Sequence, residues 1–140
     1  MIICSEVLSL DGNQIEGTLP SELGRLDHLK KLRLENNLMT GTIPKEIGKL
    51  SKLEELRLSG NDFNGSIPSE LVLCSKIEVL RLSRNNFLGT IPSELFHLRQ
   101  MKQLFLYNNK LTGFIPSNIH QVEQLERSKW LYLCRSNHCQ

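Results

Sequence analysis

The sequence of 140 residues predicts an α/β solenoid, and two observations support this prediction. A block of 24 residues recurs five times without slippage, so prolines fall at 20, 44, 68, 92 and 116 and glycines at 17, 41, 65, 89 and 113. Four of the five blocks also begin with apolar residues spaced as Leu29, Leu32 and Leu34. The Leu-x-Leu alternation is typical of a short strand with one buried face. A fixed period in this range indicates stacked repeats that bury a common core, for which about three are needed.

The remaining elements of each repeat follow from its residue types. An asparagine comes after the strand at one fixed phase, and a buried amide must be hydrogen-bonded, here to backbone groups of its own turn and a neighbouring one. We call these residues the Asn ladder: Asn13, Asn37, Asn61, Asn85 and Asn109. The glycine permits a bend with positive φ, and the Ile-Pro pair fixes the turn. One or two 3₁₀ or α turns then follow on the outer face, with a serine as their predicted N-cap in four repeats. These serines are Ser21, Ser69, Ser93 and Ser117.

The repeats predict one domain with atypical ends. Residues 1–4 are a stub without a full N-terminal cap, residues 5–125 hold the five repeats, and residues 126–140 form an imperfect C-terminal cap. Ser5 stands at the first apolar position of the first repeat. In the predicted cap, Trp130 and Tyr132 are expected to cover the open end of the core.

The spacing L-x-x-L-x-L-x-x-N-x-L-x-G-x-I-P-x-x-L-G-x-L resembles the plant-type leucine-rich repeat of receptor-like kinases, receptor-like proteins and polygalacturonase-inhibiting proteins. The resemblance covers residues 7–125. It implies a right-handed superhelix with a parallel β-sheet on the concave face and short 3₁₀ or α turns on the convex face. It also implies a protein or peptide partner and an extracellular or cell-surface location. The same scaffold serves many partners, so the fold alone does not assign the function.

Composition narrows the classes of partner and compartment. The formal net charge of +2 gives no general attraction to nucleic acid, and no apolar run is long enough to span a bilayer. The start, MIICSEVLSL, lacks the features of a signal peptide. Cys4 precedes the first strand without the rest of a cap, so an internal piece of a longer protein is one interpretation. An intracellular protein with reduced thiols is another.

The other cysteines and one asparagine predict structural or modification sites. Cys74 occupies the phase of Leu50 and Leu98, so we expect a buried, small hydrophobic side chain. Cys134 and Cys139 are close enough for a small-loop disulfide, and the family resemblance implies paired cysteines at this end. Asn64 begins the glycosylation sequon Asn-Gly-Ser, which matters only if the protein is secreted.

The strand side chains that face solvent form the predicted binding surface, because the sheet of a solenoid makes an extended concave face. The column between the strand leucines reads Ser9, Arg33, Arg57, Arg81 and Phe105. Glu35 and Glu55 are placed to offset Arg33 and Arg57, which leaves Arg81 the least compensated. One hypothesis is a basic-aromatic patch that receives a carboxylate or an acidic peptide. Its residues are Arg57, Arg81, Arg84, Phe105 and Tyr107. The competing interpretation is that the arginines recur with the repeat and keep the sheet soluble.

Catalytic and metal sites are not predicted, and no cofactor is implied. The four histidines (28, 97, 120 and 138) are scattered among turn and tail phases, with no nucleophile placed beside them. Cys134, His138 and Cys139 lack the usual spacing of zinc ligands. The sequence therefore predicts a non-catalytic recognition module. The alternatives are an inhibitor of a secreted enzyme, similar to polygalacturonase-inhibiting proteins, and a fragment without a partner of its own.

Overall fold

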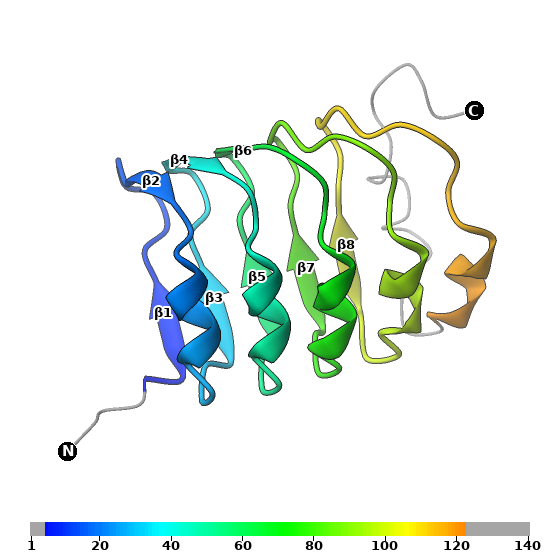
Figure 1. The fold of residues 1–140 in the computed structure, drawn as a ribbon, viewed down its shortest axis with the longest axis horizontal. Helices are drawn as coiled ribbons and strands as arrows, with labels where there is room; N and C mark the ends of the chain where they lie inside the picture. Colours follow the sequence, from blue (N-terminus) through cyan, green and yellow to red (C-terminus); the bar gives the residue numbers. More distant parts are fainter. Residues whose placement is uncertain (1–4, 123–140) are drawn as a thin grey trace.

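The computed structural model describes residues 5–122, which form a curved stack of five turns (Figure 1). Each turn contributes one three-residue strand to a parallel sheet with the order β1-β3-β5-β7-β8. These strands are β1 (Val7–Ser9), β3 (Lys31–Arg33), β5 (Glu55–Arg57), β7 (Val79–Arg81) and β8 (Gln103–Phe105). Leucines at the centre of the strands pair in register, as Leu32 does with Leu56 and Leu56 with Leu80. The predicted α/β solenoid is confirmed.

A second, smaller parallel sheet has the order β2-β4-β6 and lies beside the first. Its strands are β2 (Glu16–Thr18), β4 (Leu38–Gly41) and β6 (Asp62–Phe63). Beyond β6, the flank continues as an isolated bridge between Ser66 and Leu88 and as single backbone hydrogen bonds, such as the one from Thr112 N–H to the carbonyl oxygen of Gly89. The flank is therefore most regular in the first three repeats.

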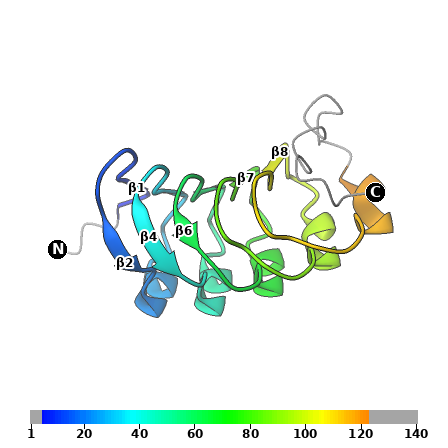
Figure 2. The same cartoon turned by 90° about the horizontal axis from the view of Figure 1, so that it is seen from above.

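Short 3₁₀ turns occupy the outer side of the arc, opposite the five-stranded sheet (Figure 2). They are η1 (Ser21–Arg25), η2 (Lys45–Lys49), η3 (Ser69–Leu73), η4 (Ser93–His97) and η5 (Ser117–Gln121). The prediction that serines cap these turns is wrong. Each serine is the first residue of its turn, the preceding proline is the N-cap, and no side-chain cap hydrogen bond forms. The Ser21 hydroxyl instead donates to the carboxylate of Glu22 at 3.3 Å.

The core is continuous from one turn to the next because equivalent apolar side chains stack. The central leucines Leu32, Leu56 and Leu80 are fully buried. Phe63 and Phe87 are also fully buried and stack with ring centroids 6.3 Å apart. The prediction for Cys74 is confirmed, since its side chain is fully buried and its Sγ atom donates to the carbonyl oxygen of Ile47 at 3.1 Å. Burial raises the pKa of the Cys74 thiol to about 11.

The Asn ladder ties each turn to the one before it. The side-chain amide of Asn61 donates to the carbonyl oxygens of Leu34 and Leu58, and its Oδ1 accepts from the backbone N–H of Met39. Asn37 and Asn85 are buried in the same way, and Asn109 is half-buried. Asn13 is exposed and bonds only carbonyl oxygens of its own turn, because no described turn precedes it. These bonds fix the spacing of the strands that carry the concave face.

Candidate peptide-binding face

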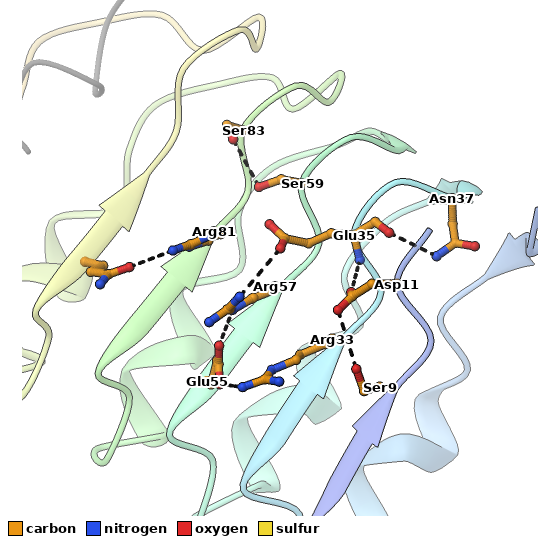
Figure 3. Close-up of polar contacts among 11 residues, drawn as sticks. Ser9, Asp11, Arg33, Glu35, Asn37, Glu55, Arg57, Ser59, Arg81 and Ser83 are labelled. Atoms are coloured by element: carbon orange, nitrogen blue, oxygen red, sulfur yellow. Dashed lines mark hydrogen bonds and ion pairs between the residues drawn. The ribbon is translucent and has the colours of Figure 1, made fainter. Parts of the chain in front are cut away.

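Strand register brings the predicted columns together on the concave face (Figure 3). Ser9 pairs with Arg33, Arg33 with Arg57, Arg57 with Arg81 and Arg81 with Phe105. Because neighbouring strands lie about 4.8 Å apart, the three arginines would repel one another if nothing lay between them. The arginines of the column differ in their partners: Arg33 and Arg57 contact carboxylates, whereas Arg81 contacts an amide and an aromatic ring.

In the first three repeats, acidic side chains neutralise the arginines. Arg33 Nη2 donates to Glu55 Oε2 at 2.7 Å, and Arg57 forms ion pairs with both Glu55 and Glu35. Glu55 is the central group of this network and is only 5% exposed. Arg33 and Arg57 are therefore engaged with internal partners, which leaves them fewer donors for a ligand.

Acid should weaken the fold through Glu55. Burial alone raises the pKa of Glu55, but the hydrogen bond from Arg33 and the charge of Arg57 outweigh burial, so the pKa of Glu55 lies below its ordinary value. A carboxyl with a lowered pKa in the fold contributes stability that is full above its unfolded pKa of about 4.3 and is lost as the pH falls through its folded pKa. We expect Glu55→Gln to lower the free energy of unfolding at neutral pH, with a difference from wild type that shrinks below about pH 4. Urea titrations of both proteins across this range check the result, and a difference independent of pH would contradict it.

In the last two repeats, Arg81 meets aromatic and amide groups. Arg81 Nη2 donates to Gln103 Oε1 at 3.0 Å, and the guanidinium carbon lies 5.0 Å from the centroid of the Phe105 ring. Phe105 and Tyr107 meet edge to face, with centroids 6.4 Å apart. Within residues 5–122, neither Arg81 nor Arg84 forms an ion pair, in contrast to Arg33 and Arg57.

A shallow hollow of about 230 Å³ lies over these groups. Its floor contains Ser59 and Ser83, whose hydroxyls are hydrogen-bonded at 3.0 Å (Figure 3). Its lining includes both ends of the charge pattern: Glu35, Asn36, Ser59, Gly60, Arg81, Ser83, Arg84, Phe105 and Tyr107. The hollow thus combines guanidinium groups that have no carboxylate partner within residues 5–122 with aromatic side chains, an arrangement that can bind an anion next to an apolar group.

Arg84 has a backbone conformation that disfavours an arginine. Its φ is +54°, in the left-handed region. The same phase in other repeats is held by Gly12, Asn36, Gly60 and Asn108, whose φ values are also positive. Glycine and asparagine adopt this conformation readily, whereas another L-residue costs about 1–2 kcal/mol.

Arg84→Asn should therefore stabilise the protein while weakening binding. Asparagine is the residue at the same phase in Asn36 and Asn108, so we expect the free energy of unfolding to rise by about 0.5–1 kcal/mol. Urea denaturation measures this gain, and Arg84→Lys, which keeps both the charge and the strain, is the matched control. Equal stability of the two variants would contradict the conformational cost.

The other predicted sites are placed as follows. Asn64 is exposed just after β6, on the flank rather than on the concave face, and its backbone N–H donates to the carbonyl oxygen of Gly41. Cys4, Cys134, Cys139 and the predicted cap at 126–140 lie outside the described residues. Sequence reasoning did not include Ser59, Ser83 or Gln103 in the site, although each occupies a column that faces the concave side. The predicted patch was limited to charged and aromatic residues, although the sequence columns that flank the arginines already contain these three residues.

Residues 5–122 contain no group of three or more His, Cys, Asp or Glu side chains arranged to hold a metal ion. In the same range, no helix has the length and apolar character that crossing a membrane requires.

Comparison with known families identifies the repeats. Models described as leucine-rich repeat match residues 6–63, 76–98 and 100–122, which together are more than half of the chain. The chain belongs to the leucine-rich-repeat family. A search of curated protein sequences found no match.

Solved structures similar to this leucine-rich-repeat chain include plant receptors. The Arabidopsis receptor kinase HAESA, in complex with the peptide hormone IDA and the co-receptor SERK1, is 36% identical with a TM-score of 0.84, and the match covers 86% of this chain and 20% of that one. The ectodomain of the Arabidopsis receptor kinase SOBIR1 is 33% identical with a TM-score of 0.81, covering 85% and 64%. A plant ice-binding protein is 34% identical with a TM-score of 0.79, covering 82% and 38%. The chain is thus a plant-type leucine-rich-repeat protein that spans less than two thirds of each of these structures.

Proposed function

We propose that this protein is a non-catalytic recognition module that binds an acidic peptide, or an acidic segment of a protein, on the concave face of its last two repeats. The observation that carries the proposal is the asymmetry of the arginine column. Arg33 and Arg57 are engaged with internal carboxylates, whereas Arg81 has no ion pair in the described chain and lies over an aromatic ring. Guanidinium groups bind carboxylates bidentately, and aromatic side chains provide apolar anchors, so the hollow offers both parts of a peptide site.

The similar structures support the class of partner. HAESA is bound to a peptide hormone and a co-receptor, so a close structural neighbour uses this scaffold for peptide and protein recognition. SOBIR1 is described as a receptor-kinase ectodomain, which supports an extracellular or cell-surface location for this chain as well. The chain would act as part of a larger receptor-like protein or as a secreted binder, and Asn64 would then be an exposed glycosylation site.

Selection from a display library of random linear peptides tests the proposed function without a known ligand. We expect the selected peptides to be enriched in Asp and Glu. The Arg81→Ala/Arg84→Ala double variant should bind them at least about 10-fold more weakly, because two charge-assisted contacts are lost. Arg25→Ala, which removes an exposed arginine from the outer turn η1, is the matched control and should bind unchanged. Selected peptides that keep their affinity for the double variant would refute the proposal.

A second candidate function is favoured by one observation on the flank. Exposed hydroxyls stack in successive repeats at Thr18, Thr42, Ser66 and Thr90, and a regular array of this kind can match a crystalline ligand. One similar structure is an ice-binding protein, which makes ice the ligand to test. Phe114 ends the column in the fifth repeat, so the array is short. Slowed ice growth that is abolished by Thr42→Tyr would favour this candidate over peptide recognition.

A further inference from the structure

The hollow on the concave face has opposite charges at its two ends. At one end lies Glu35, whose side chain is 17% exposed. Its carboxylate is 3.9 Å from Arg57 Nη1, which is longer than a hydrogen bond, and Arg57 lies closer to Glu55. Within residues 5–122, no group donates a hydrogen bond to the Glu35 carboxylate. This carboxylate therefore keeps its capacity to accept hydrogen bonds from a ligand.

The positive end lies two repeats further along the solenoid. Arg84 and Arg81 belong to the fourth repeat, and Arg81 leans toward Gln103 of the fifth, away from Glu35. Two strand spacings of about 4.8 Å separate the second repeat from the fourth, so the two ends are about 10 Å apart. Between them, Ser59 and Ser83 present only short hydroxyl side chains, which leave room for a chain to pass over them.

We propose that this hollow selects a peptide by the spacing of two opposite charges, with a basic side chain over Glu35 and an acidic side chain over Arg81 and Arg84. This inference rests on the proposed function, because it names the peptide that the same hollow binds. A peptide in the polyproline II conformation has three residues per turn and advances about 3.1 Å per residue, so side chains three positions apart point to the same side and lie about 9 Å apart, close to the separation of the two ends. The favoured motif is Lys-x-x-Glu or its reverse, depending on the direction in which the peptide crosses the strands.

Glu35 provides specificity as well as attraction. An acidic side chain placed over Glu35 meets a like charge, so a uniformly acidic peptide is disfavoured at this end. A basic side chain at this position is not repelled, and it can donate a hydrogen bond to the Glu35 carboxylate. Two peptides can therefore present the same acidic side chain to Arg81 and still differ in affinity. The peptide with a basic residue three positions away, over Glu35, binds more tightly than the peptide with an acidic residue there.

Four fluorescent synthetic peptides test the spacing by anisotropy. Two carry Lys and Glu three positions apart, one in each order, a third has the same composition with Lys and Glu adjacent, and the fourth has Ala in place of Lys. We expect one spaced peptide to bind wild type about 5-fold or more tightly than both the adjacent peptide and the Ala peptide, the ratio typical of one partly buried ion pair. Glu35→Gln should remove this advantage, so that the spaced, adjacent and Ala peptides bind this variant with equal affinity. The Glu35 backbone contacts remain in this variant, so its fold can be verified by circular dichroism.

The outcomes separate the two proposals. Equal binding of spaced and adjacent peptides to wild type, or an advantage that survives Glu35→Gln, overturns the spacing rule. If Arg81→Ala still lowers the affinity for every peptide in that case, the acidic-peptide site stands without it. If Arg81→Ala changes no affinity, or no peptide binds, the proposed function fails and the spacing rule fails with it.

Discussion

Replacing Phe63 with alanine is expected to lower the free energy of unfolding by about 3–5 kcal/mol. The Phe63 ring is fully buried and stacks on Phe87 of the next repeat, so the substitution removes apolar contacts and leaves a cavity between two turns. A solenoid is stable only through contacts between neighbouring turns, and a cavity at this junction weakens the coupling of the first repeats to the last. Urea denaturation followed by circular dichroism measures the loss.

Phe114→Ala is the matched control for this prediction. Its ring is 84% exposed, so its truncation should change the free energy of unfolding by no more than about 0.5 kcal/mol. Similar losses for the two phenylalanines would show that Phe63 is not buried between stacked turns.

Asn61→Leu is expected to cost about 2–4 kcal/mol, although leucine has a similar volume and is more apolar. The substitution leaves the buried N–H of Met39 without its acceptor. It also removes one donor each from the carbonyl oxygens of Leu34 and Leu58, which keep their bonds to Asn37 and Asn85. An orphaned buried donor loses its full hydration without replacement, so the added apolar surface does not compensate.

Asn13→Leu is the matched control, because it makes the same substitution at a position that does not bond a neighbouring turn. Asn13 holds the same phase but is exposed and bonds only its own turn, so its replacement should cost less than about 1 kcal/mol. Thermal unfolding of the two variants gives the comparison. A stability of Asn61→Leu equal to that of Asn13→Leu would mean that the ladder does not join the repeats.

The repeat architecture could be predicted because its causes are local and recur. Each repeat carries the same leucine alternation, the same asparagine position and the same Gly and Pro positions. Each of the five copies therefore predicts the same local structure independently. Once the strands are known to stack, the register of Arg33, Arg57 and Arg81 follows without coordinates. The serine caps were predicted wrongly because an N-cap preference does not show where a turn starts. The extended proline before Ser21 takes the cap position.

The character of the site was only partly accessible from the sequence. The columns indicated that Arg81 is the least compensated arginine, and the described ion pairs agree. Side-chain direction was not accessible: Glu55 reaches both Arg33 and Arg57, and Arg81 leans toward Gln103. Arg84 has a positive φ because its position in the repeat requires one. The sequence indicates this only when Arg84 is aligned with Asn36 and Gly60, which occupy the same position in other repeats. Rotamers and local strain depend on neighbours in other repeats, which a single repeat does not encode.

The proposed site is tested most directly by mapping a bound peptide onto the protein. Amide chemical shifts of the ¹⁵N-labelled chain are measured while a peptide selected from the display library is added. We expect the largest changes on residues 81–84 and 103–107, with small changes on the outer turns at 21–25 and 45–49. Changes concentrated on those outer turns, or on the flank strands at 16–18 and 38–41, would contradict this expectation.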